Sequence, residues 1–456
     1  MFMQIQTARE LALKVITDIE QNGAYSGVHL NVVFKKQGTP VIDKAFISEI
    51  VYGVIRNKTY LDYVIEKFSK VKIKKMSVWI HNILRIGIYQ ILFMTKIPHS
   101  AACNESVNLA RRYGHNASAG FVNAVLRKVA SEKDKIAYPD VNEDFEKYLS
   151  IRYSFPENLT HRWCELYGNE FTEQLMQESN KPPELSIRVN TLATDTEALK
   201  TSLTKRGFKV SEGKYCDDAL YIRNSAAMHD TDEFKKGLFY TQDEASMIAV
   251  RALEPKEGDF VIDVCSAPGG KATYMAQLMN NKGKILARDV HPHKIKLIEE
   301  NIARLGIDII EPEIWNSAII DDRLIKKADA VIADCPCTGY GVIRKKPEIK
   351  WARKDSDIDE IASIQKYILS SASEYVRPGG VLVYCTCTME PIENEDRVLE
   401  FLDENSEFSL EDLKPYLPKK LECEGAERGY ITLFPNVQGI DGFFIARFKR
   451  AQEKGI

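Results

Sequence analysis

Apolar side chains recur at intervals of three and four residues through the first part of the chain, as in Ala8–Ile19 and Ile80–Leu92. That spacing predicts amphipathic helices, because residues three and four apart share one helical face. We therefore predict an all-helical domain over residues 1–135. The polar, acidic stretch over residues 136–150 contains a proline and has the composition of a linker.

Beyond residue 241 the pattern changes to short apolar runs that alternate with longer amphipathic segments. Strand alternating with helix predicts a doubly wound parallel sheet, and we place this α/β domain at residues 241–450. Residues 151–240 mix the two patterns, so we expect a small α+β segment that packs on the α/β domain. Strands are predicted at Phe260–Val264, Lys284–Arg288, Ala330–Ala333, Val381–Tyr384 and Phe443–Phe448, and helices at Asp243–Ala252, Lys271–Met279, Pro292–Leu305 and Ile358–Val376.

The turn after the first predicted strand of this domain has the composition of a nucleotide-binding loop. Its two glycines permit close backbone approach, and the helix that follows directs N–H groups toward a ligand. The turn lacks the Gly-x-Gly-x-x-Gly pattern of dinucleotide sites and the Gly-Lys-Ser/Thr end of a phosphate loop. The predicted ligand loop consists of Cys265, Ser266, Ala267, Pro268, Gly269, Gly270 and Lys271.

Three polar residues stand where later strands are predicted to end. Asp289 follows the glycine turn by about twenty positions, where an acid binds ribose hydroxyls. Asn316 is placed to hydrogen-bond a base edge, and Asp334 ends the next strand. Strand-end acids also serve as helix caps. Three polar strand-end residues beyond a glycine turn favour a cofactor that contains a nucleoside.

Charge is unevenly distributed along the 456 residues. Residues 1–140 hold 20 Lys and Arg against 11 Asp and Glu, although the whole chain has a net charge of −3. A basic front end on an acidic body indicates a polyanion-binding module attached to a second domain. The sequence shows no membrane-spanning run and no export signal, and nine cysteines in a long chain fit a reducing compartment. We expect a cytoplasmic protein without membrane attachment.

Two cysteine pairs, Cys335 with Cys337 and Cys385 with Cys387, each follow a predicted strand, so one sheet edge should hold both. Three interpretations remain open: a four-thiol zinc site, buried inert cysteines, or a reactive thiol beside Asp334 and a second thiol. Because the usual Cys-x-x-Cys spacing is absent, we predict no metal.

A basic segment at residues 342–351 lies between the two cysteine pairs. Its positive charge is expected to lower the pKa of a nearby thiol and to attract RNA phosphate. The residues predicted to contact RNA here are Arg344, Lys345 and Lys350.

A nucleophilic thiol, an acid, a second thiol and a nucleoside-bearing methyl donor are the groups required to methylate cytosine at C5. The C5 atom is a poor nucleophile until a thiolate adds at C6. The acid shares a proton with N3, and a base finally removes the C5 proton. A target base inside a helix must also be flipped out, at a cost of a few kcal/mol.

The segments Asp263–Lys271, Asp334–Cys337 and Thr386–Glu395 together resemble the signature of RNA (cytosine-5)-methyltransferases. The basic helical front end resembles a NusB-type RNA-binding domain. With both parts, the whole chain is similar to the RsmB (Sun/Fmu) family of 16S ribosomal RNA methyltransferases. The resemblance implies a Rossmann-like methyltransferase domain, an all-α NusB-like domain, S-adenosylmethionine as cofactor, and small-subunit ribosomal RNA as partner of a monomeric enzyme.

The resemblance also implies a role for individual residues. Cys265 to Lys271 and Asp289 would contact S-adenosylmethionine, and Asp334 would lie between cofactor and base. Cys387 would be the nucleophile and Cys337 would assist its release. The ranges Arg188 to Asn190 and Glu393 to Glu395 match family segments that line the site, and Arg188 and Asn190 are predicted to contact substrate.

Two positions depart from the family pattern. Asn316 replaces a common acid, and Cys335 replaces a common alanine. The alternatives are a tRNA cytosine-5 methyltransferase and a non-catalytic, NusB-like RNA-binding or antitermination factor.

Overall fold

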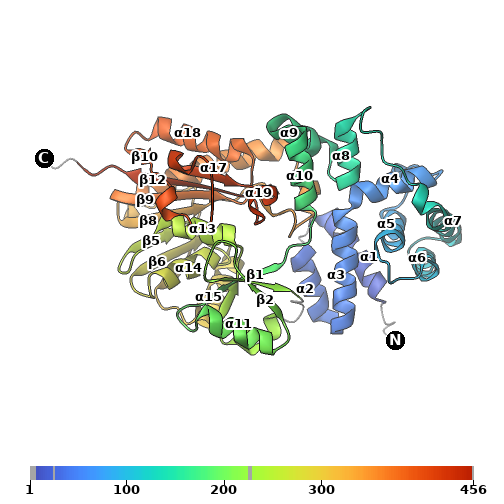
Figure 1. The fold of residues 1–456 in the computed structure, drawn as a ribbon, viewed down its shortest axis with the longest axis horizontal. Coiled ribbons are helices and arrows are strands. Elements are labelled where there is room, and N and C mark those ends of the chain that lie inside the picture. The colour runs from blue at the N-terminus through green and yellow to red at the C-terminus, as the bar shows by residue number, and fades with distance from the viewer. Residues whose placement is uncertain (1–6, 24–25, 38, 224–227, 454–456) are drawn as a thin grey trace. The chain divides into compact units, whose positions relative to one another are not determined.

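The computed structural model describes residues 7–23, 26–37, 39–223 and 228–453. The chain forms two compact units (Figure 1). The first consists of Met1–Lys181 with Ile343–Ala352, and the second of Pro182–Val342 with Arg353–Ile456.

The first unit is helical throughout its described residues. Its core forms around α5, of which Ile83, Leu84, Ile86 and Ile88 are fully buried. Gly87 allows α7 to approach closely, since a Cβ atom there would lie 2.6 Å from a methyl carbon of Leu126. The helices are α1 (Ala8–Asn22), α2 (Ser26–Gln37), α3 (Val41–Arg56), α4 (Lys58–Phe68), η1 (Ile73–Lys75), α5 (Val78–Phe93), α6 (His99–Tyr113), α7 (Asn116–Glu132), η2 (Lys133–Lys135), α8 (Phe145–Tyr153), α9 (Glu157–Tyr167), α10 (Asn169–Ser179) and α16 (Ile349–Ala352).

The segment Ile343–Ala352, far along the chain, is part of this helical unit. Glu348 accepts hydrogen bonds from Ser26, at 3.0 Å from the backbone N–H and 2.8 Å from the hydroxyl. Trp351 donates its indole N–H to the carbonyl of Ile55 at 3.2 Å. A stretch that interrupts the second unit in sequence therefore completes the packing of the first.

The second unit begins with a small antiparallel sheet. Its strand order is β2-β3-β1-β4, and every pairing is antiparallel. Leu199 and Leu203 of α11 are buried in its apolar cluster with Ile187 and Val189 of the central strand. The elements are β1 (Leu185–Val189), α11 (Thr196–Lys205), β2 (Lys209–Glu212), β3 (Ala219–Arg223), η3 (Met228–Asp230), α12 (Asp232–Lys235) and β4 (Phe239–Thr241).

The larger sheet follows, in the order β10-β12-β9-β8-β5-β6-β7, with β11 also paired to β12. The five strands β9-β8-β5-β6-β7 are parallel, whereas β12 is antiparallel to β9 and to the two short strands beyond it. The strands are β5 (Phe260–Asp263), β6 (Lys284–Asp289), β7 (Ile310–Ile314), β8 (Ala328–Asp334), β9 (Val376–Thr386), β10 (Phe408–Leu410), β11 (Tyr430–Leu433) and β12 (Phe443–Arg450).

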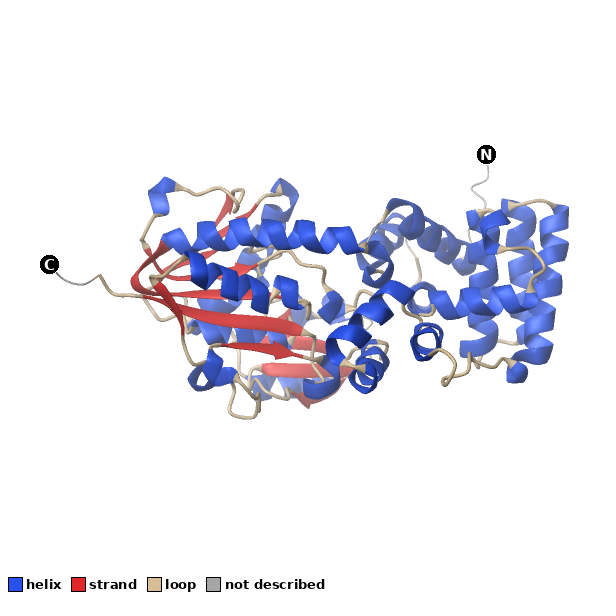
Figure 2. Cartoon of the chain, turned by 90° about the horizontal axis from the view of Figure 1, so that it is seen from above, coloured by secondary structure: helices blue, strands red, loops and turns tan. Residues whose placement is uncertain are grey.

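Helices cover both faces of the larger sheet (Figures 1 and 2). One core contains apolar residues of α13, α14 and α15, and a separate core on the other face contains those of α17 and α18. The helices are α13 (Glu244–Leu253), α14 (Gly270–Leu278), α15 (Pro292–Leu305), η4 (Asp322–Leu324), η5 (Tyr340–Val342), α17 (Asp355–Tyr375), η6 (Pro391–Glu393), α18 (Glu395–Glu404), η7 (Lys414–Tyr416), η8 (Ala426–Arg428) and α19 (Pro435–Gln438).

Three features differ from the sequence-based predictions. The expected linker at residues 136–150 includes the start of α8. Asp144 caps the N-terminus of this helix, and its carboxylate accepts from the N–H of Lys147 at 2.9 Å. The expected α+β segment 151–240 is divided after Lys181: α9 and α10 lie in the first unit, whereas the four strands and α11 lie in the second. The sheet is mixed rather than wholly parallel, because the chain ends in antiparallel strands that alternation alone does not reveal.

Candidate active site

The carboxyl ends of β5, β6, β8 and β9 bring most predicted site residues to one edge of the larger sheet. Parallel pairing of β8 with β9 places Asp334 beside Cys385. Each strand then continues into a short loop, with Cys337 three residues beyond Asp334 and Cys387 two residues beyond Cys385. This register brings the two cysteine pairs to a common edge, as parallel strands require.

Cys337 and Cys387 face each other directly. Their sulfur atoms are 3.1 Å apart, and both side chains are partly exposed. The neighbouring Cys387 thiol, and then burial, raise the pKa of Cys337 well above its ordinary value. The expected lowering of this pKa by the basic segment is wrong for Cys337, because a second thiol and negative charges at Asp334 and Glu393 surround it.

Asp334 connects Cys385 to the glycine turn. Its carboxylate forms an ion pair with the ammonium of Lys271 and accepts from the thiol of Cys385 at 3.6 Å. Burial disfavours the charged form of Lys271, but Asp334 outweighs it and raises the pKa of Lys271 above its usual value. A cation and a carboxylate are thus held together at the sheet edge, where a reacting base requires a proton partner.

Asp263, at the end of β5, is a buried carboxyl group near the hydroxyl of Ser266 and the N–H of Cys265, both of which oppose the rise in its pKa. Neither of its oxygens has a hydrogen-bond partner within the described residues, and its side chain is fully buried. Burial, followed by the negative charge of Asp334, raises the pKa of Asp263 to about 7. An orphaned acceptor next to the glycine turn is suited to the ammonium group of a bound ligand.

The turn itself provides further groups for a nucleoside-bearing cofactor. Gly269 has a φ of 96°, a conformation that favours glycine, and α14 begins immediately after it with its N–H groups unpaired by the helix. The hydroxyl of Ser266 is buried and has no partner among the described residues. Asp289 ends β6 and accepts from the N–H of His291 at 3.0 Å. These donors and acceptors fit S-adenosylmethionine, whose ammonium, carboxylate and ribose hydroxyls need both kinds.

Asn316 lies two residues beyond β7, next to the strand that carries Asp289. Its side-chain oxygen accepts from the N–H of Ala318 at 3.1 Å, and the N–H of Trp315 donates to the carbonyl of Asp289 at 3.1 Å. The loop that contains Asn316 is therefore attached to the end of β6 at Asp289.

Arg188 and Asn190 support the site from within the protein. Arg188 is fully buried and donates to the carbonyl of Gly270 at 2.7 Å, the hydroxyl of Thr273 at 2.9 Å and the side chain of Gln242. Asn190 donates to the carbonyls of Gly237 and Leu305 at 2.9 and 3.0 Å. Arg188 therefore holds the first turn of α14, and both side chains are bonded to protein rather than presented to RNA.

The three basic residues predicted to contact RNA between the thiol pairs all lie in the helical unit. Lys350 is buried, with its ammonium 2.9 Å from the carbonyl of Arg56, 2.7 Å from that of Ser154 and 3.1 Å from the amide oxygen of Asn180. Arg344 is also buried, and Lys345 is half-buried. Lys350 has three donors and three protein acceptors, which leaves none for phosphate.

No group of three or more His, Cys, Asp or Glu side chains is placed to hold a metal ion in the described part of the chain. Cys335 points into the apolar core that contains α17, while Cys385 lies in the core on the opposite face. Since the four thiols are distributed in this way, the zinc alternative has no ligand set.

Sequence reasoning placed Glu393 in a segment that lines the site but missed the two threonines that connect it to the thiols. Thr338 follows Cys337, Thr388 follows Cys387, and Glu393 bonds to Thr338. The Cys-Thr dipeptide, which occurs at residues 337–338, 385–386 and 387–388, was the available signal, because hydroxyl groups that follow neighbouring strands can share a hydrogen-bond partner.

Comparison with known proteins places this site in a family. The model described as "16S rRNA methyltransferase RsmB/F" matches residues 250–449, a NusB family model matches residues 6–131, and an RsmF/B-like ferredoxin-like domain matches residues 155–229. A probable ribosomal RNA small subunit methyltransferase B of Bacillus subtilis is 35% identical over 98% of this chain and 100% of its own length. The chain belongs to the RsmB/F family of 16S rRNA methyltransferases.

Solved structures agree with this family assignment. PH0851 superimposes with a TM-score of 0.82 and 28% identity over 98% of this chain and 99% of its own. NSun6 from Pyrococcus horikoshii, solved with SFG, has a TM-score of 0.59 and 26% identity over 66% of this chain and all of its own. As an RsmB/F member the chain is an rRNA methyltransferase that uses S-adenosylmethionine, which confirms the predicted fold class, enzyme class and cofactor.

No helix within the described ranges is both long and apolar enough to cross a bilayer.

Proposed function

We propose that this RsmB/F enzyme methylates C5 of a cytosine in 16S ribosomal RNA through a covalent bond between Cys387 and C6 of the base. The observation that carries the proposal is the 3.1 Å contact between the sulfurs of Cys337 and Cys387, beside the Lys271–Asp334 ion pair. One edge of the sheet then carries a nucleophile, a second thiol and an acid–base pair.

Each residue has one task in this mechanism. The thiolate of Cys387 adds to C6, and Asp334 shares the proton that N3 gains. Bound S-adenosylmethionine would supply the electrophilic methyl group that C5 takes up, with a neutral thioether as the leaving group. Once Cys387 is bonded to C6, the thiol contact that raises the pKa of Cys337 is lost, so Cys337 can release its proton to solvent. The Cys337 thiolate then removes the C5 proton, after which the C6–sulfur bond breaks and N3 loses its proton. Cys387 is released to begin another cycle.

The cofactor is proposed to bind along the glycine turn. The turn Cys265–Lys271 and Asp289 would hold it, with Asn316 on the base side. The orphaned carboxyl of Asp263 is the acceptor that a ligand ammonium group would pair with. Arg188 would act by keeping the first turn of α14 in place.

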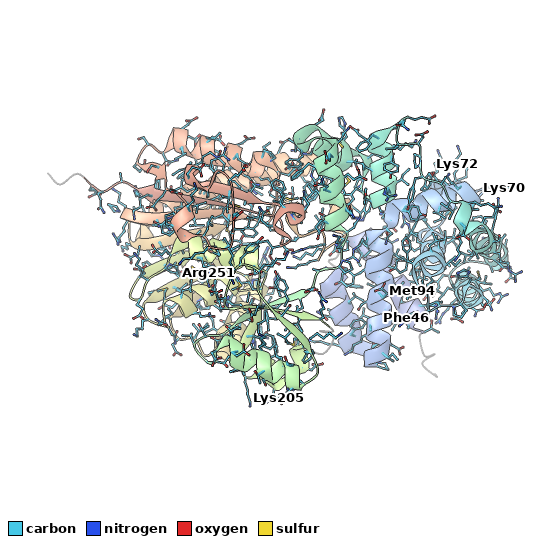
Figure 3. All side chains as sticks on the ribbon, viewed as in Figure 1. Phe46, Lys70, Lys72, Met94, Lys205 and Arg251 are labelled. Atoms are coloured by element: carbon cyan, nitrogen blue, oxygen red, sulfur yellow. The ribbon has the colours of Figure 1, made fainter. Side chains whose placement is uncertain are left out.

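The helical unit is proposed to bind RNA through its exposed lysines. They gather where α4 ends, on η1, and at the end of α7, and Lys70 and Lys72 are labelled in Figure 3. Phosphate contacts by lysine release counterions, so RNA affinity should depend steeply on salt. The exposed lysines are Lys67, Lys70, Lys72, Lys74, Lys75 and Lys128.

The test is methyl transfer with defined RNA. Purified protein is incubated with methyl-labelled S-adenosylmethionine and unmodified 16S rRNA, tRNA or assembled small subunits, and 5-methylcytosine is mapped by mass spectrometry. We expect one modified cytosine in 16S rRNA, none in tRNA, and none in any RNA with Cys387→Ala. Methylation confined to tRNA would establish the alternative substrate, and RNA binding without any methylation would favour a non-catalytic factor.

Size and location follow from the same proposal. A single chain provides every proposed catalytic group from its second unit, so we propose an active monomer. Because ribosomal RNA is the substrate, the enzyme would act in the cytoplasm. Sedimentation of the active enzyme tests the first statement, and activity that requires a dimer would contradict it.

A further inference from the structure

Both thiols of the facing pair are followed by a threonine, and the two threonines are bonded to each other. The hydroxyl oxygens of Thr338 and Thr388 are 2.7 Å apart, and both side chains are fully buried. The N–H of Gly341 also donates to the carbonyl of Cys387 at 3.0 Å. The loop after β8 and the loop after β9 are therefore joined immediately beyond each sulfur.

Glu393, on the short helix η6, is the residue on which these contacts converge. Its side chain is fully buried, and its carboxylate accepts from Thr338 twice, at 2.9 Å from the backbone N–H and 2.5 Å from the hydroxyl. It also accepts from the side-chain amide of Gln365 at 2.9 Å. The carbonyl of Glu393 in turn accepts from the hydroxyl of Tyr384 on β9 at 2.5 Å.

These contacts set the direction of the hydrogen-bond chain. Because the hydroxyl of Thr338 donates to the carboxylate of Glu393, its oxygen remains to accept from the hydroxyl of Thr388. The chain runs from Thr388 through Thr338 to Glu393. Buried and fully bonded, such a network specifies one arrangement of the loops that form it.

We propose that Glu393 is a positioning residue that holds the Cys337 loop against the Cys387 loop, so that both sulfurs meet the same base. Glu393 acts through Thr338 and Thr388 and takes no part in proton transfer. The inference rests on the proposed function, in which both thiols act on one cytosine.

The contact between the sulfurs can be measured without RNA or cofactor. Hydrogen peroxide oxidises two adjacent thiols to a disulfide, loses its O–O bond and becomes two waters, with both protons and both electrons coming from the thiols. Peptide mass spectrometry of the oxidised full-length protein distinguishes the Cys337–Cys387 disulfide from disulfides between other cysteines. We expect the wild type to form this bond, and Glu393→Ala to form it at least about tenfold more slowly.

Kinetics and a conservative variant separate positioning from proton transfer. We expect Glu393→Ala to lower kcat by about a hundredfold, with KM for S-adenosylmethionine changed less than about twofold. Glu393→Gln should retain most of the wild-type rate of disulfide formation and most of the wild-type kcat. Its oxygen would accept from Gln365 and the Thr338 N–H, and its amide would donate to the Thr338 hydroxyl, which then donates to Thr388. An amide cannot transfer protons in place of a carboxyl group, so rescue by glutamine supports positioning.

Two further variants keep the test decisive. Thr388→Val is nearly isosteric and removes only the hydroxyl bridge, so it should slow disulfide formation even if Glu393→Ala fails to fold. Glu244→Ala is the matched control, because Glu244 is an equally buried carboxylate that accepts from the backbone of Lys214, Tyr215 and Cys216, away from the thiols. It should leave the rate of disulfide formation unchanged.

The outcomes are distinct. Wild-type disulfide rates in Glu393→Ala and Thr388→Val would overturn the proposal, as would a Glu393→Gln enzyme that is as inactive as Glu393→Ala. Rapid disulfide formation in a wild-type protein that methylates no RNA would remove the proposed function and leave the structural role of Glu393 intact.

Discussion

The sulfur atoms of Cys337 and Cys387 lie 3.1 Å apart although fifty residues separate them along the chain. They form no disulfide, since every cysteine is free, and an S–S bond would require about 2.05 Å. Two parallel strands, β8 and β9, hold the loops that carry them. This contact is the basis of the first prediction.

Replacing Cys337 with alanine should trap the enzyme on its substrate. The Cys387–C6 bond would still form and C5 would still be methylated, but the thiol proposed to accept the C5 proton would be missing. We expect a covalent protein–RNA species on a denaturing gel with Cys337→Ala and none with the double variant Cys337→Ala/Cys387→Ala. An adduct that survives in the double variant would assign nucleophilic attack to another residue.

The buried carboxyl of Asp263 should make stability depend on pH. Its pKa is about 7 in the native state and about 4 when unfolded, so between these values the native state holds a proton that the unfolded state lacks. Stability should therefore fall as pH rises from about 4 to 7. Asp263→Asn mimics the protonated form, and its stability relative to wild type should increase by up to about 3–4 kcal/mol over this window.

Urea unfolding at pH 5 and pH 8 in the absence of cofactor measures the Asp263 effect. Asp322→Asn, at an exposed position on η4, is the control and should show no comparable difference. If the difference in unfolding free energy between Asp263→Asn and wild type is the same at pH 5 and pH 8, Asp263 ionises in the native state much as it does in the unfolded chain.

Lys350 should contribute to stability rather than to RNA affinity. Lys350→Met removes three donors from buried oxygens of Arg56, Ser154 and Asn180, and we expect a loss of about 2–4 kcal/mol. Lys346→Met, at an exposed position in the same segment, should cost much less. Unfolding and RNA-binding curves for both variants provide the measurement, and an unaltered unfolding midpoint with weakened RNA binding would restore Lys350 as a phosphate contact.

The exposed lysines of the helical unit should determine how RNA binding depends on salt. Replacing Lys70, Lys72 and Lys74 with glutamine removes three phosphate contacts, so the slope of log K against log salt should decrease by about 2–3. The control triple variant at Lys205, Lys235 and Lys236 removes the same charge from the second unit, where Lys205 is labelled in Figure 3. Equal slopes for the two triple variants would remove the RNA role from this lysine cluster.

Much of the fold and part of the site follow from local sequence. The apolar run Phe260–Val264 followed by two glycines specifies strand, turn and helix, because β-branched residues and positive-φ positions restrict the backbone over a few residues. Likewise, apolar residues at intervals of three and four predict α5, because residues with this spacing share one helical face. Such reasoning predicted the strand at Phe443–Phe448 but not its antiparallel direction, because the direction of β12 relative to the sheet depends on the distant strand with which it pairs.

Side-chain partners show the same limit. The order of charged residues along residues 342–351 suggested a surface for RNA, yet Glu348 bonds to Ser26 and Lys350 to the carbonyl of Ser154. A lysine on a helix has the same sequence pattern whether it meets solvent or a buried carbonyl. Its environment depends on segments more than a hundred residues away.

By itself the sequence determined which chemical groups this protein has and at which strand ends they stand, because residue type and short-range periodicity act locally. Only the tertiary structure decided which groups meet: Cys337 with Cys387, Lys271 with Asp334, and Glu393 with Thr338. The physical reason is that strand register and the packing of distant segments determine distances of a few ångströms. Spacing along the chain does not encode those distances.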